Sequence, residues 1–406
     1  MRSFLALALV AAIVLWPQHS RADRADRETL RQAFQQAGIS LKLAEPQVEL
    51  LDEIIDTIVE RHVDARDSHV LAGKAAAAIA AKNQPLDQAV KAGLAELTHS
   101  LDPHTAYLPP NEWNDMQVSV SGKFSGVGME LALKDKAVLV VSPIDGSPAA
   151  LAGIRTDDRV LAVDDESVDG LTLGQVVARI RGPVGTDVRL RLRDPAGIER
   201  DLTITRDVIR LQPVKGRLEG DIGYVRISQF SGGVSALLRN QVMELDRQSA
   251  FGLRGLVLDL RRNPGGVLDE AVKMADLFLG DVVIVSTQAR NPADNDNRHG
   301  RQGEIVAGIP MAVLIDGGSA SAAEIVAGAL KDQGRATLVG QKSYGKGSVQ
   351  VLEEVSQGGV RVTIARYFRP NKQPVDGIGI SPDIEIIPAE NSDPQLERAL
   401  EVVRKR

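Results

Sequence analysis

Apolar residues at helical spacing dominate the chain from about residue 45 to Leu97. The segment "EPQVELLDEIIDTIVERHVD" has an apolar residue every three or four positions, and the alanine-rich segments "VLAGKAAAAIAAK" and "LDQAVKAGLAEL" continue this character. A period near 3.6 residues indicates amphipathic helices with one buried face. We therefore predict a helical N-terminal region over residues 23–115.

Short strand-like runs separated by glycines replace this pattern from about Ser121 to Asp207. The runs are "GVGMEL", "AVLVVSPI", "DDRVLAVDDESV" and "TDVRLRLRD", and the only helical stretch among them is "LGQVVARIR". Apolar alternation bounded by turn residues is typical of strands. The pattern predicts a compact β-rich module over residues 116–207.

Strands and helices alternate in the remainder of the chain. The strand-like segments "IGYVRISQF", "GLVLDLR" and "MAVLID" are each followed by a helical segment, and "DPQLERALEVVRKR" resembles a capped amphipathic helix. This alternation indicates a layered α/β domain. We assign the domain to residues 208–388 and a helical tail to residues 389–406.

The first residues have the order of a secretory signal. Arg2 precedes an apolar run from Phe4 to Trp16, and a polar stretch then ends at Ala22. The apolar run is shorter than the ~20 residues that a membrane-spanning helix needs. We expect a signal peptide over residues 1–22 and export to the periplasm or another extracytoplasmic compartment. The alternative is an uncleaved leader that anchors the protein at the membrane.

Composition excludes several classes of function. The chain has 43% hydrophobic and 25% charged residues, which is ordinary for a globular protein. Its formal net charge is -6 without a basic stripe, so we expect no nucleic-acid partner. Cysteine is absent, and no histidine pair has a metal-binding spacing such as H-x-x-x-H. These features argue against disulfides, a thiol nucleophile, a metal or any other cofactor.

Ser321 is the first candidate for chemistry. It lies in "GGSASAAEIVAGAL", directly after the strand-like "MAVLID", and Ser321-Ala-Ala-Glu324 has the spacing of a helix capping box. A serine at a helix start also lies beside unsatisfied backbone N–H groups, such as that of Ala322, which can stabilise an oxyanion. A helix cap and a nucleophile are therefore both compatible with this position.

A serine nucleophile needs a base, and Lys346 in "QKSYGKGSVQ" is the leading candidate. A lysine can accept the serine proton only if burial lowers its pKa from ~10.4 toward neutrality. Gln350 lies four residues further on and, in a strand of period two, would share a face with Lys346 and could orient it. The alternative for Lys346 is an ordinary solvated lysine in a turn. A second candidate base is His104 in "SLDPHTAY", but its position among turn residues favours a structural histidine.

Several segments together resemble the C-terminal processing peptidases, also called tail-specific proteases. They occur in that family's order over roughly residues 45–388: "SLDPHTAYLPP", "FSGVGMEL", "LDLRRNPGG", "GGSASAAEIVAGALKDQGRATLVG", "YGKGSVQ" and "GIGISPD". The resemblance implies a crotonase-like α/β serine protease core with an inserted PDZ domain over residues 116–207. It also implies Ser321 as nucleophile, Lys346 as general base and Gln350 as the residue that holds the lysine.

The same resemblance implies two binding sites made of backbone amides. The oxyanion hole would combine the N–H of Ala322 with that of Gly265 or Gly266. The N–H groups of residues Val127, Gly128 and Met129 would bind the C-terminal carboxylate of a substrate, whose tail adds to a sheet edge by β-augmentation.

These expectations describe an exported serine endopeptidase that binds protein substrates by their C-termini and cleaves them with a Ser–Lys dyad. The alternative is a PDZ-type binding module or chaperone whose hydrolase core does not turn over. An activating adaptor protein and a homo-oligomer are compatible with the sequence, which specifies neither.

Overall fold

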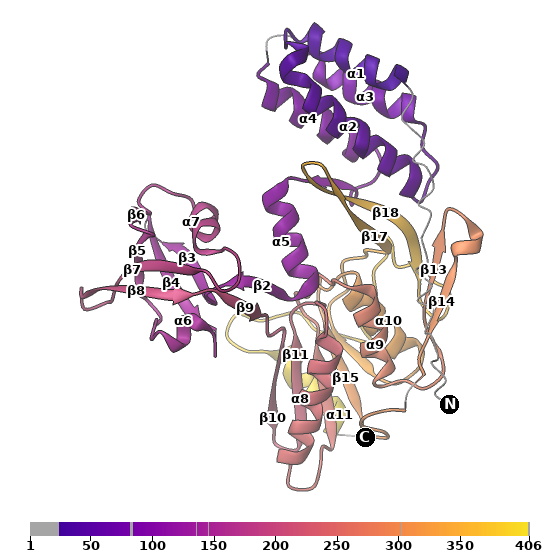
Figure 1. The fold of residues 1–406 in the computed structure, drawn as a ribbon. Helices are drawn as coiled ribbons and strands as arrows, with labels where there is room; N and C mark the ends of the chain where they lie inside the picture. Colours follow the sequence, from indigo (N-terminus) through magenta and orange to yellow (C-terminus); the bar gives the residue numbers. More distant parts are fainter. Residues whose placement is uncertain (1–23, 82–83, 135, 145, 302, 405–406) are drawn as a thin grey trace, which may run out of the picture. The chain divides into compact units, whose positions relative to one another are not determined.

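The computed structural model describes residues 24–81, 84–134, 136–144, 146–301 and 303–404, so the predicted signal peptide lies outside the described residues. The chain divides into two compact units (Figure 1). The first unit comprises residues up to Asn114 together with 286–296 and 347–368. The second unit comprises residues 115–285, 297–346 and 369–406. Within the described residues, no helix is both long and apolar enough to cross a membrane.

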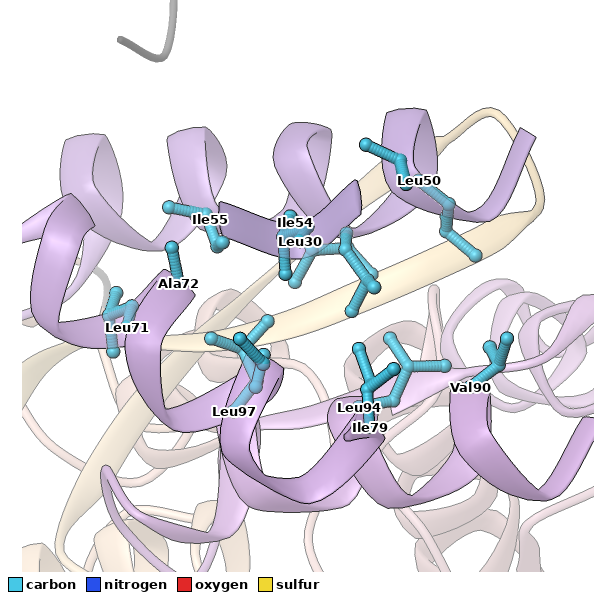
Figure 2. Packing of buried hydrophobic residues seen from close by; sticks show 14 of the residues in the cluster. Leu30, Leu50, Ile54, Ile55, Leu71, Ala72, Ile79, Val90, Leu94 and Leu97 are labelled. Carbon is cyan, nitrogen blue, oxygen red and sulfur yellow. The ribbon is translucent and has the colours of Figure 1, made fainter. Parts of the chain in front are cut away.

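Four helices and a β-hairpin share one apolar core in the first unit. The helices are α1 (Arg24–Gln36), α2 (Leu41–Arg61), α3 (Ser68–Ile79) and α4 (Leu86–His99). Their apolar faces meet at residues such as Leu30, Ile54 and Leu97, which are fully buried (Figure 2). Each such side chain contributes about 1.5–3 kcal/mol of burial free energy. The helical spacing in the sequence thus marks the residues that hold this unit together.

The hairpin of the first unit carries one of the predicted site residues. Its strands are β17 (Ser348–Val355) and β18 (Gly358–Phe368), and β18 also pairs with β1 (Ala106–Leu108) and β13 (Val283–Ala289). The sheet ends with β14 (Asp296–His299), which follows a short 3-10 helix, η1 (Pro292–Asp294). Trp113 lies in the first turn of α5 (Pro110–Ser121), and its ring packs against Gly359. A Cβ atom added to Gly359 would lie only 2.1 Å from this ring.

The β-rich module lies in the second unit and contains one main sheet. Its strand order is β3-β4-β5-β7-β8, with β6 paired to β5. The strands are β3 (Met129–Lys134), β4 (Ala137–Pro143), β5 (Arg159–Val163), β6 (Glu166–Ser167), β7 (Asp187–Arg193) and β8 (Glu199–Thr205). Helices α6 (Pro148–Leu151) and α7 (Leu173–Ile180) complete it, and α7 packs against β3. Strands β2 (Lys123–Gly126) and β9 (Asp207–Arg210) pair antiparallel at its two chain ends.

The α/β domain of the second unit is built on a six-stranded sheet. Its order is β10-β11-β12-β15-β16-β19, and all neighbouring pairs from β11 onward are parallel. The strands are β10 (Val214–Glu219), β11 (Ile222–Ile227), β12 (Gly255–Asp259), β15 (Met311–Ile315), β16 (Thr337–Gly340) and β19 (Ile384–Glu385). Residues of β12 and β15 are buried throughout, as expected for parallel strands covered on both faces.

Four helices belong to this sheet. They are α8 (Val234–Gln248), α9 (Leu268–Asp276), α10 (Ala322–Asp332) and α11 (Pro394–Arg404). Helix α11 packs on the sheet face that bears Tyr224, Val257 and Leu314, while α9 packs against both α8 and α10. The α/β class with a β-rich module and a helical N-terminal region is therefore confirmed. The crotonase-like detail stays a prediction.

Candidate active site

Two neighbouring parallel strands, β12 and β15, deliver the segments that form the candidate site. Asp259 at the end of β12 is the register partner of Leu314 in β15, so both strands end at the same edge of the sheet. The segments that follow them are hydrogen-bonded to each other. Ala320 N–H donates to Asn263 O at 2.9 Å, and Arg262 N–H donates to the Asp316 carboxylate at 2.8 Å. The "NPGG" turn and the "GGSAS" turn are thus fixed side by side.

Ser321 has an unusual backbone conformation at the start of α10. Its φ is 54° and its ψ is -115°, whereas an ordinary helix cap has extended dihedral angles. Positive φ in a residue other than glycine is strained and occurs preferentially at functional sites. A sharp strand-to-helix turn with a strained serine also occurs in hydrolases, where it exposes the hydroxyl. The observed backbone therefore favours a role for Ser321 beyond that of a simple cap.

Gly265 of the "NPGG" turn packs directly against Ser321. An added Cβ at Gly265 would lie 2.8 Å from the Ser321 Cβ and 2.9 Å from the Ala322 nitrogen, so only glycine fits there. The Gly265 N–H itself donates to the side chain of Asn263 at 2.9 Å. Because this amide is already engaged, the Gly266 N–H is the better candidate of the two for an oxyanion hole. The oxyanion-hole role of either amide stays a prediction.

The chain just before this turn is fixed by an ionic network. Arg261 donates to both carboxylate oxygens of Asp259 and to both of Asp393, which precedes α11. Burial by itself lowers the pKa of Arg261, but the hydrogen bonds to these two carboxylates raise it well above its usual range. Asp259 is fully buried, so this pairing compensates a charge that would otherwise be costly.

Glu324 connects the backbones of the two predicted dyad residues. It is 1% exposed, and its Oε2 accepts hydrogen bonds from the N–H groups of Ser321 at 2.8 Å and Lys346 at 2.9 Å. Its Oε1 accepts from Ser343 Oγ at 2.6 Å and from the Gly345 N–H at 2.7 Å. Burial raises the pKa of Glu324 above its usual value, although these hydrogen bonds oppose that rise. One buried carboxylate therefore holds the turn of Ser321 and the loop of Lys346 together.

Sequence reasoning assigned Glu324 only to a capping box and missed its other contacts. The signal that could have revealed them is a glutamate within an otherwise apolar and alanine-rich helix start. A buried charge needs several hydrogen-bond donors, and a helix in its first turn cannot supply them all. Such a glutamate indicates donors from elsewhere in the fold, but the sequence does not say which residues supply them.

Gln350 belongs to the first unit, whereas Ser321 and Lys346 belong to the second. Strand β17 begins at Ser348 and has a bulge between Val349 and Gln350. Lys346 therefore precedes the strand, and the argument that placed both side chains on one strand face is wrong. The contact between the two side chains stays a prediction.

His104, the second candidate base, contributes its backbone to a turn in the first unit. Its N–H donates to Asp102 Oδ1 at 2.7 Å, and its carbonyl oxygen accepts from Arg361 Nε at 2.8 Å. These bonds agree with the interpretation of a residue in a structural turn. Within the described residues, no group of three or more potential metal ligands comes together.

The predicted carboxylate-binding loop connects β2 to β3 in the β-rich module. The carbonyl oxygen of Val127 accepts from Ala149 N–H, and that of Gly128 accepts from Ile144 N–H and from Ser147 Oγ. Gly128 has a φ of 80°, and a Cβ there would collide with Ser147 at 2.4 Å. The carbonyl groups are thus used for fixing the loop. Met129 begins β3, which is an edge strand of its sheet.

Comparison with known protein families identifies two segments. The model of peptidase family S41 matches residues 221–386, a range that contains Gly265, Ser321, Lys346 and Gln350. A PDZ domain model matches residues 139–194, within the predicted β-rich module. Residues 127–129 precede the matched range, so the carboxylate-binding role predicted for them stays a prediction.

Individual relatives cover most of the chain. A carboxy-terminal-processing protease of Bartonella bacilliformis is 42% identical over 291 residues, which are 71% of this chain and 67% of that protein. A carboxyl-terminal-processing protease of a Synechocystis species is 38% identical over 305 residues, covering 71% and 69% of the two chains. The solved structure of a photosystem II D1 C-terminal processing protease covers 88% of this chain and 97% of its own, with 29% identity and a TM-score of 0.50.

Proposed function

Because the chain belongs to the carboxyl-terminal-processing proteases of peptidase family S41, serine proteases that here include a PDZ domain, we propose that it cleaves peptide bonds with a Ser321–Lys346 dyad. The observation that carries this proposal is the buried carboxylate of Glu324, which accepts hydrogen bonds from the backbones of both residues. A contact of this kind fixes the nucleophile and the base relative to each other through their main chains.

In the proposed mechanism, the uncharged Lys346 amine takes the proton of the Ser321 hydroxyl as the serine oxygen attacks the scissile carbonyl carbon. The N–H groups of Ala322 and Gly266 stabilise the resulting oxyanion. The protonated lysine then gives its proton to the leaving amine as the peptide bond breaks. Water hydrolyses the acyl-enzyme in the same manner and restores the serine. Gln350 accepts a hydrogen bond from the lysine and orients it.

We further propose that the PDZ domain captures the C-terminal tail of the substrate. Strand β3 is an edge strand and α7 packs beside it, which is the arrangement that β-augmentation requires. The N–H groups of residues Val127, Gly128 and Met129 would receive the terminal carboxylate. The side chains of Met129 and Leu131 pack against the core of this domain and stay partly exposed, which leaves apolar surface at β3 for an apolar tail to contact.

The leader suggests where the protein works. A signal peptide over residues 1–22 would direct it to the cell envelope, with cleavage after Ala22 or retention as a membrane anchor. Protein substrates are the required partners of such an enzyme. An activating adaptor protein and assembly into a homo-oligomer are compatible with this proposal.

The experiment that tests the proposal uses the mature protein from residue 23 onward. Wild type, Ser321→Ala and Ser356→Ala are incubated with unfolded proteins that end in apolar or charged tails, and the products are analysed by mass spectrometry. Ser356 is exposed in the hairpin turn and serves as the matched control. We expect fragments from the wild type and from Ser356→Ala only. Tail binding without fragments in all three proteins would instead support a PDZ-type binding module or chaperone.

A further inference from the structure

A chain of polar side chains in the first unit ends at Gln350. The bulge in β17 makes Gln350 the register partner of Thr363 in β18. The amide Nε2 of Gln350 donates to Ser348 Oγ at 2.8 Å and to Thr363 Oγ1 at 3.4 Å. Because the amide is planar, holding its nitrogen also fixes the direction in which its carbonyl oxygen points.

The next residue in this chain, Thr363, can transmit a preference for one amide orientation. Its Oγ1 lies 3.1 Å from Asp102 Oδ1, and an ionised carboxylate only accepts hydrogen bonds. The single hydroxyl hydrogen of Thr363 is therefore given to Asp102, which leaves a lone pair for the Gln350 amide. If the Gln350 amide were flipped, its carbonyl oxygen would face that lone pair, and the two acceptors would repel each other. Asp102 thus determines, through Thr363, which end of the amide faces the hydroxyl.

Asp102 is itself held in place from several directions. Its Oδ1 accepts from the N–H groups of His104 at 2.7 Å and Thr105 at 2.9 Å, and its Oδ2 accepts from Thr105 Oγ1 at 2.7 Å. His62 directly follows α2, and its Nε2 lies 3.0 Å from Oδ2 and must donate to it. Burial alone would raise the pKa of Asp102, but the hydrogen bonds from His62 and Thr105 hold it well below its usual range. The carboxylate therefore stays an acceptor near neutral pH.

We propose that Asp102 is a positioning residue of the protease: acting through Thr363, it fixes the amide of Gln350 so that the carbonyl oxygen is available to hold the base lysine. This inference rests on the proposed Ser321–Lys346 mechanism. In this proposal Asp102 acts only through Thr363 and Gln350, so its effect should appear in turnover rather than in substrate binding.

The first test replaces the hydroxyl that links the two ends of the chain. Thr363→Val removes the hydroxyl at nearly constant volume, whereas Thr363→Ser retains it. Thr98→Val is the matched control, because Thr98 is also buried in the first unit but donates only within α4, to the carbonyl oxygens of Leu94 and Ala95. We expect Thr363→Val to lower kcat by up to ~100-fold with little change in KM. Thr363→Ser should recover most of that loss, and Thr98→Val should turn over at the wild-type rate.

The second test is a double-mutant cycle, which distinguishes an effect of Asp102 through Gln350 from an independent structural effect. Asp102→Asn and Gln350→Ala are each measured alone and then combined. If Asp102 acts through Gln350, the double variant loses no more kcat than Gln350→Ala alone. Multiplicative losses would mean that Asp102 acts independently of Gln350, and they would overturn the inference. If Asp102→Asn does not fold, the Thr363 pair still decides the question.

The comparison of wild type with Ser321→Ala is made first, so that two different failures can be told apart. Absence of serine-dependent cleavage would overturn the proposed function and, with it, this role of Asp102. Serine-dependent cleavage combined with a fully active Thr363→Val variant would overturn only the inference. Thermal unfolding of every variant shows whether a loss of kcat follows from a loss of folded protein.

Discussion

The substitution Glu324→Gln tests whether one carboxylate holds the turn of Ser321 and the loop of Lys346. It preserves the shape of the side chain but replaces one acceptor oxygen by an NH2 donor. Ser343 Oγ can rotate and accept from this NH2, so the amide nitrogen fits best in the present position of Oε1. There it faces the buried Gly345 N–H, which loses its acceptor. The N–H groups of Ser321 and Lys346 keep the remaining oxygen, now without its charge.

The magnitude follows from the bonds that change. A buried N–H group without a partner costs about 1–3 kcal/mol, so the free energy of unfolding should fall by at least that amount. Gly345 directly precedes Lys346, and a displaced base should lower kcat by on the order of 10-fold to 100-fold. Glu324→Ala removes all four bonds and should be more severe in both respects. Chemical denaturation and peptide cleavage at one temperature provide the two measurements.

Glu354→Gln makes the same substitution at an exposed position of β17 and is the control. Its effect on the free energy of unfolding should stay within about 0.5 kcal/mol. Wild-type stability together with wild-type kcat in Glu324→Gln would refute the reasoning, because it would mean that the charge and the fourth acceptor position are dispensable.

Three further outcomes are expected. Amidation of a substrate tail removes the charge that the N–H groups of residues 127–129 would receive, so binding measured by calorimetry should weaken roughly tenfold or more, and equal affinity would argue against this loop. Gly265→Ala should abolish cleavage in a folded protein because its Cβ would lie 2.8 Å from the Ser321 Cβ, while Gly334→Ala, which also has positive φ but nothing within 4 Å, should stay active. The pKa of Asp102 is depressed in the folded state, so its ionised form stabilises the fold at pH values above ~3.9, the pKa of an aspartate in the unfolded chain. This stabilisation is lost as the pH falls from there through the lower pKa of the folded state. Acid unfolding should therefore be less steep in Asp102→Asn.

The elements that bear the site were predictable because they follow local rules. Apolar runs predicted strands β12 and β15, and the glycines and the S-x-x-E spacing predicted the turns that follow them. Parallel neighbours end at one sheet edge, which explains why the "NPGG" turn meets Ser321. The hydrogen bond from the Gly265 N–H to Asn263 was not predictable, because it depends on how the Asn263 side chain is oriented.

The contacts that reach across the sequence were beyond local rules. The donors to Glu324 from Ser343, Gly345 and Lys346 arrive from a loop about twenty residues away, and the capping-box pattern records only the bond to Ser321. Similarly, the segment "SLDPHTAY" drew attention to His104, whereas Asp102 makes the contacts to the side chains of His62, which directly follows α2, and of Thr363 in β18. The prediction that Lys346 and Gln350 share a strand face assumed a regular strand and was wrong, because β17 has a bulge directly before Gln350.

The central claim is that Lys346 is the base for Ser321, and the cleavage rate of Lys346→Arg tests it most directly. Arginine keeps the charge and approximate length, but its guanidinium does not lose its proton in a protein. The rate is measured on a substrate with a free apolar tail, beside wild type and Ser321→Ala, with tail binding followed in parallel. The account predicts that Lys346→Arg is as inactive as Ser321→Ala while it binds the tail with wild-type affinity. Cleavage by Lys346→Arg at near the wild-type rate would contradict the claim.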